Sequence, residues 1–324
     1  MKNVKIIEVK SELGAGTRGA SLGIDALKIA CLDAGSDYFK RFNSIEVPND
    51  NHVLFDKNLF PFAKHIDSIL VTLKSISSTI AQTFEFNMFP LVLAADHSNA
   101  AGTIAGIKAA HPDKRLGVIW IDAHSDIHSP YTTPSGNMHG MSLAIALNED
   151  NKDCKINDLD PESRFFWRSV KKVGVEGPKF SYDDLIYIMV RSYEVPEDYL
   201  MKKHNIKNYH FDEFNQKGAE NIANEALARL KDCDLIYISF DVDSLDSKFS
   251  KGTGTPVETG LTVEQAKELC ACLVKDPRVC CFEMVEINPT LDTENTMAEN
   301  AFEILEATTN SLVERLGKVE KVSA

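Results

Sequence analysis

The sequence predicts an α/β fold in which one mostly parallel sheet carries helices on both faces. Three observations predict this fold class. Six short apolar runs have the composition of strands that are buried on both faces. Amphipathic stretches separate these runs. No low-complexity linker or internal repeat divides the 324 residues, so we expect a single domain over residues 1–324.

The expected strands are short runs dominated by Val, Ile, Leu and aromatic residues. A parallel sheet covered on both sides is the arrangement that buries such runs completely. In chain order they occupy residues 5–9, 91–95, 117–123, 185–191, 235–243 and 279–287.

Two of the intervening helices have recognisable starts. Ser98 is expected to cap a helix that runs to Ala110. Thr262 and Gln265 form the Thr-x-x-Gln pattern of a capping box, ahead of a helix that ends near Lys275. The stretch 147–182 is polar and poorly periodic, and we interpret it as a surface insertion.

The charge balance limits the classes of ligand. Hydrophobic residues make up 44% of the chain and charged residues 26%, which is typical of a globular protein with a sizeable core. The formal net charge is −13, whereas nucleic acids and anionic membranes require a basic face, so we expect neither as a partner. The first ten residues lack a secretory signal, and the seven scattered cysteines fit a reducing compartment. We therefore expect a cytoplasmic protein.

Acids and histidines follow four of the expected strands. Ligands of an open parallel sheet bind beyond the carboxyl ends of its strands, so these side chains should meet at one edge. A single aspartate at a strand end is usually a cap or turn residue, but carboxylates gathered this densely repel one another unless a cation lies among them. The side chains concerned are Asp96, His97, Asp122, His124, Asp126, Asp241, Asp243 and Glu286.

One of these strand ends is unusually regular. The run VIWIDAHSDIHSP, residues 118–130, carries Asp122, His124 and Asp126 at every second position. In an extended segment such residues point to one side, so we expect the three side chains to converge.

The donor types indicate the metal. Imidazole with an excess of carboxylate oxygen suits Mn²⁺ or a similar first-row divalent ion, and the lack of thiolate disfavours a closed zinc site. One catalytic ion with an open position cannot use six protein ligands, and six are available here: His97, Asp122, His124, Asp126, Asp241 and Asp243. Two ions about 3.5 to 4 Å apart with shared carboxylates would accommodate them. We therefore expect two Mn²⁺ ions per subunit.

The strand-end motifs, taken together, resemble those of the arginase or ureohydrolase superfamily, and most closely those of the arginases. Their order matches the order in that family, and the resemblance extends from the Arg18-Gly19-Ala20 segment nearly to the end of the chain. The motifs are AADHSNAAG at 94–102, IDAHSDIHSP at 121–130, SGNMHG at 135–140, SFDVDSLD at 239–246, TGTPVETGLT at 253–262 and VEINPTLD at 285–292.

The resemblance implies a three-layer α/β domain, a homo-oligomeric assembly (trimer or hexamer) and hydrolysis of a guanidino group. The expected reaction converts L-arginine to L-ornithine and urea by attack of a metal-bridging hydroxide. By the resemblance, one ion would bind His97, Asp122, Asp126 and Asp241, and the other Asp122, His124, Asp241 and Asp243.

The resemblance also implies catalytic roles. Asp126 would carry a proton to the departing nitrogen, and His139 would exchange protons with solvent. Glu286 would pair with the substrate guanidinium, which Thr255 would help to fix.

Substrate choice depends on a second group of residues. Thr133, Ser135 and Asn137 match the positions with which arginases contact the α-carboxylate, which favours L-arginine. His128 stands where arginases usually carry asparagine, and Glu194 where they usually carry aspartate for the α-amino group. Formimidoylglutamase, agmatinase and other guanidino-acid hydrolases of the superfamily therefore remain alternatives.

Two hypotheses from other classes compete with this interpretation. Gly14, Gly16 and Gly19 satisfy the GxGxxG pattern of dinucleotide-binding enzymes, but residues 10–13 separate them from the strand, and a dinucleotide site leaves the strand-end acids unexplained. The third hypothesis is a metal-binding or assembly protein without activity. Urea release by the Mn²⁺-loaded protein distinguishes all three.

Overall fold

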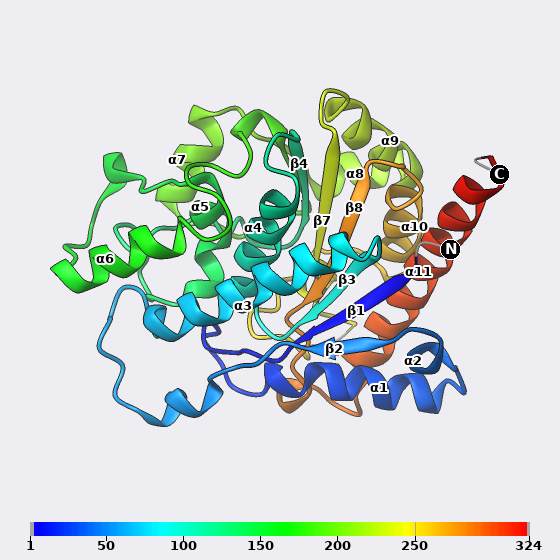
Figure 1. The fold of residues 1–324 in the computed structure, drawn as a ribbon, viewed down its shortest axis with the longest axis horizontal. Helices are drawn as coiled ribbons and strands as arrows, with labels where there is room; N and C mark the ends of the chain where they lie inside the picture. Colours follow the sequence, from blue (N-terminus) through cyan, green and yellow to red (C-terminus); the bar gives the residue numbers. More distant parts are fainter. Residues whose placement is uncertain (1–2, 250, 323–324) are drawn as a thin grey trace.

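A computed structural model describes residues 3–249 and 251–322; residues 1, 2, 250, 323 and 324 of the predicted domain lie outside the described residues. The described strands form one eight-stranded sheet in the order β2-β1-β3-β8-β7-β4-β5-β6, with every neighbouring pair parallel (Figure 1). Their bounds are Val4–Val9 (β1), Ser44–Glu46 (β2), Phe89–Ala94 (β3), Leu116–Ile121 (β4), Leu185–Ile188 (β5), Lys207–Tyr209 (β6), Leu235–Asp241 (β7) and Val279–Val285 (β8).

The six predicted strands are confirmed, and the sheet is parallel as predicted. Strands β2 and β6 were not predicted. Each has only three residues and lies at an edge of the sheet, so neither is long enough to show a hydrophobic period.

Helices cover both faces of this sheet, which confirms the predicted three-layer fold. The helices are Gly23–Asp33 (α1), Tyr38–Arg41 (α2), Ile66–Glu85 (α3), Ala100–Ala110 (α4), Ser142–Leu147 (α5), Pro161–Val170 (α6), Val195–Lys203 (α7), Phe211–Lys217 (α8), Ala219–Arg229 (α9), Val263–Leu273 (α10) and Thr296–Val322 (α11).

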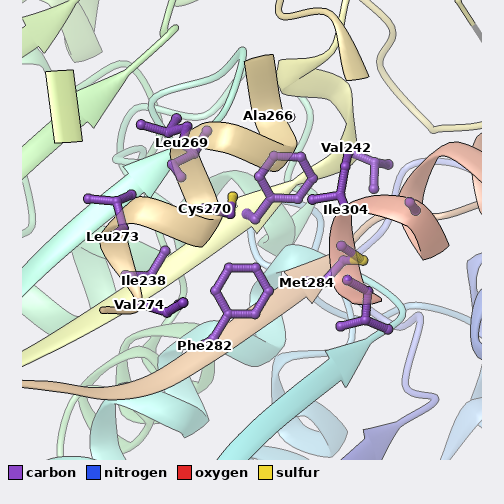
Figure 2. Close-up of a cluster of buried hydrophobic side chains, with 14 of the residues drawn as sticks. Ile238, Val242, Ala266, Leu269, Cys270, Leu273, Val274, Phe282, Met284 and Ile304 are labelled. Carbon is purple, nitrogen blue, oxygen red and sulfur yellow. The ribbon is translucent and has the colours of Figure 1, made fainter. Parts of the chain in front are cut away.

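Alternate residues of the strands enter two separate cores because successive side chains point to opposite faces. Val118 and Trp120 of β4 pack with α3, α4 and α5 on one face, whereas Ile119 and Ile121 join the core formed with α1, α9, α10 and α11. Figure 2 shows part of the second core, which includes Ile238, Phe282, Met284, Leu269, Leu273 and Ile304.

The structure tests both predicted helix starts. The capping box is confirmed: the side chain of Thr262 accepts from the backbone N–H of Gln265 at 3.1 Å, and the Gln265 side chain accepts from the N–H of Thr262 at 2.9 Å. The predicted serine cap is wrong. The N–H of Ser98 donates to Asp96 at 2.7 Å, and a 3₁₀ turn, His97–Asn99, precedes α4. Asp96 therefore caps this segment, because its carboxylate reaches the free N–H groups at the strand end.

The stretch 147–182 contains α6, which Asp160 caps by accepting from Glu162 and Ser163. Trp167 and Val170 of this helix are buried in the same core as α3 and α4. No helix of the described residues has both the length and the apolar character needed to cross a lipid bilayer.

Candidate active site

Four neighbouring strands, β3, β8, β7 and β4, bring their carboxyl ends to one edge of the sheet. A cavity of about 340 Å³ lies at this edge. Asp122 and Glu286 are buried and do not line it. The other predicted site residues do: His97, His124, Asp126, His128, Thr133, Ser135, Asn137, His139, Glu194, Asp241, Asp243 and Thr255.

The first cluster surrounds one ring nitrogen of His97. Its Nδ1 atom is 3.0 Å from Asp122 Oδ2, 3.1 Å from Asp126 Oδ2 and 3.2 Å from Asp241 Oδ2. Nδ1 of His97 and Oδ2 of Asp122 have no hydrogen-bond partner among the described residues, although both are buried. Buried polar atoms are rarely left unpaired in proteins, and these residues form a group that could hold a cation.

The second cluster shares Asp122 with the first. His124 Nδ1 is 2.9 Å from Asp243 Oδ2 and 3.6 Å from Asp122 Oδ1. Ligand atoms of Asp122, His124 and Asp243 lie within 4.8 Å of one another, as do those of His97, Asp122 and Asp126. Asp122 therefore belongs to both clusters. The carboxylate of Asp241 lies beside the histidine of the first cluster, His97.

The backbone at this edge departs from the extended run that the sequence predicts. Asp126 has φ +48° and Glu286 has φ +69°, both in the left-handed region. Such conformations cost non-glycine residues about 1–3 kcal/mol and occur preferentially at functional sites. The strict alternation thus ends at Asp126, yet its carboxylate still reaches His97.

Carboxylate repulsion is visible in the pKa values. Burial and the neighbouring charge of Asp122 raise the pKa of Asp126 to about 6. Burial, with Asp243 and Asp122, raises the pKa of Asp241 well above its ordinary value. A cation among these carboxylates would relieve both burial and repulsion.

His139 and Glu286 form an ion pair beside the clusters. His139 Nδ1 is 3.1 Å from Glu286 Oε1, and the same oxygen accepts from the backbone N–H of His97 at 2.9 Å. Burial opposes protonation of His139, but the hydrogen bond and charge of Glu286 raise its pKa to about 9. Oε1 of Glu286 is therefore already engaged by a cationic side chain and by a backbone N–H.

Hydrogen-bond donors gather at another part of the cavity wall. Thr133 Oγ1 accepts from the N–H groups of Ser135 and Gly136, and Ser135 Oγ accepts from the N–H of Asn137. Lys64 Nζ donates to Asn137 Oδ1 at 2.8 Å. The two hydroxyl protons and the Asn137 amide protons thus remain available to an anionic ligand.

His128 is held by two glutamates in the same cavity. Its Nε2 is 2.7 Å from Glu194 Oε2 and 3.3 Å from Glu197 Oε2, while Nδ1 is 3.0 Å from Thr132 Oγ1. Burial opposes protonation, but the glutamates raise the pKa of His128 to about 9. Both ring nitrogens are engaged, so a substrate carboxylate can bind His128 only by displacing one of these partners.

The sequence interpretation missed Lys64 and Glu197. No motif marks Lys64, which reaches Asn137 from a distant part of the chain. Glu197 had a weak signal: with Glu194 it forms the Glu-x-x-Glu capping box of α7. Its carboxylate also accepts from Ser125 Oγ at 2.6 Å, which joins the start of α7 to the 122–126 segment.

The GxGxxG glycines pack closely against other residues, and none of the three lines the cavity. Gly14 donates its N–H to Asp96 Oδ2 at 2.9 Å and accepts from the N–H of His139 at 3.1 Å. A Cβ atom at Gly14 would lie 2.5 Å from Ser98 Oγ, so only glycine fits there. The motif reflects close packing against the strand-end residues.

Comparisons with known proteins agree with this geometry. The model of the Arginase family matches residues 2–309. The arginase of Bacillus subtilis (strain 168) is 32% identical over 311 residues, covering 94% of this chain and 97% of the relative. The crystal structure of arginase from Bacillus caldovelox superposes with a TM-score of 0.81 at 30% identity, covering 95% of this chain and 98% of that one.

A formimidoylglutamase structure from Bacillus subtilis also superposes, with a TM-score of 0.73, covering 96% of this chain and 87% of that one. Its 20% identity shows the shared fold alone. The family match covers almost the whole chain, and the relatives named arginase exceed it in identity. This chain belongs to the arginase family.

Proposed function

We propose that the protein hydrolyses L-arginine to L-ornithine and urea with two Mn²⁺ ions. The observation that carries the proposal is a pair of histidine–carboxylate clusters that share Asp122, in a cavity that also presents donors for a carboxylate. The names of its relatives in the arginase family support the same reaction.

The residues fit such a centre. Imidazole nitrogen and carboxylate oxygen are the donors that first-row divalent ions bind, and the unpaired Nδ1 of His97 faces three carboxylates. All seven cysteines are free and none belongs to the described metal-ligand groups. We assign one ion to His97, Asp122, Asp126 and Asp241 and the other to Asp122, His124, Asp241 and Asp243.

The ions, when bound, would lower the pKa of a water molecule and so make a nucleophile available at neutral pH. Asp126 lines the cavity, and we propose that its carboxylate carries a proton to the departing nitrogen. The oxygen of that water would add to the guanidinium carbon, and the tetrahedral adduct would collapse to urea as its C–N bond to ornithine breaks. The proton that Asp126 delivers to the departing nitrogen would come from the attacking water.

Glu286 and His139 would act on the guanidinium and on protons, respectively. Glu286 is a buried anion, and we propose that it pairs with the substrate guanidinium as that cation enters. His139 would then lose its ion-pair partner and exchange protons with solvent. Thr255, which donates to Asp243 Oδ2 at 3.1 Å, would help to fix the guanidinium.

The remainder of the substrate would bind the polar wall. Thr133, Ser135 and Asn137 would donate to the α-carboxylate, and Glu194 would accept from the α-amino group. One observation favours a second candidate, hydrolysis of another guanidino or formimino acid. His128 Nε2 already pairs with Glu194 Oε2, so the negative charge of Glu194 is partly compensated before a substrate amine binds.

The deciding experiment is urea release from L-arginine by the Mn²⁺-loaded protein. We expect multiple turnovers, and none after removal of the metal by a chelator. Formamide release from formiminoglutamate in place of urea would support the second candidate. A loaded protein that releases neither product from any guanidino or formimino acid would support the non-catalytic hypothesis.

Metal binding is also expected to stabilise the fold. A ligand that binds only the folded state at 100 times its Kd adds about 2.7 kcal/mol per site, so two sites add about 5 kcal/mol. For a chain of this length that corresponds to a rise in Tm of roughly 10 °C. Thermal melts of chelator-treated and Mn²⁺-loaded protein measure it. Unchanged melting after verified loading would contradict metal binding by the folded state alone.

We further propose a cytoplasmic protein, which the scattered free cysteines support. The family resemblance supports a homo-oligomer, and we propose a trimer or a hexamer. Light scattering coupled to size-exclusion chromatography measures the molecular mass of the assembly. The mass of a monomer would refute this assembly.

A further inference from the structure

A second cavity lies outside the active site. It is lined by Tyr131 and by residues of the stretch 147–182, none of which lines the active-site cavity. Its volume of about 550 Å³ is typical of a site for a small molecule. Two carboxylates, those of Asp150 and Asp158, belong to the lining, together with four cationic side chains: Lys152, Lys155, Arg164 and Arg168. The lining therefore has a formal charge of +2 (four minus two), although the whole chain has −13.

The carboxylate of Asp150 is already engaged by three donors. Its Oδ1 accepts from Trp167 Nε1 at 2.8 Å and from Lys171 Nζ at 2.6 Å, and its Oδ2 is 3.1 Å from Lys152 Nζ. Lys171 is a buried cation that does not line the cavity, so its charge adds to that of the four cations in the lining. The acidic side chains therefore do not neutralise the cavity.

The two arginines carry the unmatched charge, since Lys155 pairs with Asp158. Arg164 and Arg168 are four positions apart on α6, so their side chains lie on one face of the helix. Arg164 Nε donates to the carbonyl of Leu159 at 2.8 Å. The terminal nitrogens of Arg164 and the whole guanidinium of Arg168 make no hydrogen bond or ion pair with the residues that the structure describes. Guanidinium groups bind phosphate oxygens through paired N–H donors, so these two side chains can serve an anion.

Hydrogen bonds within the chain hold the walls of this cavity together. The carbonyl of Tyr131 accepts from the N–H groups of Ile156 and Asn157 at 2.8 and 3.0 Å. Ser129 Oγ donates to the carbonyl of Asp150 at 2.5 Å, which joins the two sides of the cavity at a second point. Because these contacts already fix the walls, binding of a ligand would cost little ordering entropy.

We infer that this cavity binds a small organic molecule through a phosphate group, with Arg164 and Arg168 as the main donors. A phosphate monoester carries about −1.5 to −2 charges at pH 7 and offers three acceptor oxygens, which matches the charge of +2 and the two guanidinium groups. The phosphate group would fill only part of the cavity, and Tyr131 and Leu159 add apolar surface to the lining. An organic phosphate therefore fits the cavity better than the free ion. This binding does not depend on the proposed reaction.

The test is calorimetric titration of the whole protein with two probes, phenyl phosphate and inorganic phosphate, at an ionic strength held constant with sodium chloride. The variants are Arg164→Gln and Arg168→Gln, which remove exposed cations and are expected to fold. Lys172→Gln is the matched control. Lys172 is an exposed cation four residues after Arg168 that pairs with Glu176 and does not line the cavity, so its loss changes the charge of the same segment by the same amount.

We expect wild type and Lys172→Gln to bind one equivalent of phenyl phosphate with the same affinity. Inorganic phosphate is expected to bind the same site more weakly, because it leaves the apolar lining uncovered. Arg164→Gln and Arg168→Gln are each expected to bind both probes about 10-fold or more weakly, because each loses charge-assisted hydrogen bonds to the phosphate.

Phenyl phosphate binding that neither arginine variant weakens would overturn the inference, because the anion would then bind elsewhere on the protein. Absence of binding by wild type at two temperatures would overturn it as well. Equal losses in Lys172→Gln and in the arginine variants would show a general effect of charge and would also refute the site. If inorganic phosphate binds as tightly as phenyl phosphate and both arginine variants weaken it, the anion site is confirmed and its ligand is the free ion. Urea release is measured separately, so failure of this site and failure of the proposed function are distinguishable.

Discussion

Asp122→Asn is expected to bind at most one Mn²⁺ and to lower kcat/KM for L-arginine by at least about 10³-fold, which corresponds to about 4 kcal/mol of transition-state stabilisation. Asp122 is the residue that both histidine–carboxylate clusters share. An amide offers one oxygen and no charge, so the variant cannot hold two cations at the shared position. Asp241→Asn is expected to behave similarly if Asp241 is the second bridge.

Metal content by elemental analysis and urea release measure the two effects. Asp234→Asn is the matched control, because Asp234 lies just before the first residue of β7, at the end of the strand away from the cavity. Its carboxylate accepts from Lys114 Nζ and from the backbone N–H of Arg115. We expect that variant to keep both ions. Two full equivalents in Asp122→Asn and Asp241→Asn would contradict the shared-carboxylate assignment.

The second large effect concerns the substrate: kcat/KM for L-arginine is expected to exceed that for agmatine by at least about 10²-fold. Agmatine lacks the α-carboxylate and would leave the donors of Thr133, Ser135 and Asn137 without an acceptor. Sites built to bind a polar group can reject an analogue that lacks it by about 10⁴-fold. We expect less here, because both ring nitrogens of His128 are engaged, by Glu194 and Thr132, so this residue adds no donor for the α-carboxylate.

Parallel assays on arginine, agmatine, guanidinobutyrate and formiminoglutamate measure this ratio. The double variant His128→Asn with Glu194→Asp releases the acid from its ion pair and restores the residues usual in arginases. It is expected to raise turnover of arginine if the ion pair only weakens an arginase site. A wild type that ignores arginine but cleaves another of these compounds would overturn the substrate assignment and preserve the hydrolase.

The separate roles of sequence and tertiary structure are clearest at the strand ends. The sequence alone predicted the six longer strands, because burial on both faces requires continuous apolar runs. It also predicted that the residues after β3, β4, β7 and β8 share one edge, since parallel strands all end on the same side. The predicted metal ligands lie at the ends of those strands or within a few residues after them, so their gathering needed no knowledge of long-range packing.

Only the tertiary structure decided the contacts that depend on strand register and on segments distant in the chain. Nothing in the sequence of β7 or β8 shows that Glu283 lies beside Ser239, because register is fixed by packing of the whole sheet. Lys64 reaches Asn137 across 73 positions, and Glu194 meets His128 across 66. Local patterns report the face and the end of a strand at which a residue lies. Which charged side chains pair with one another depends on how distant segments pack, and only the tertiary structure determines this packing.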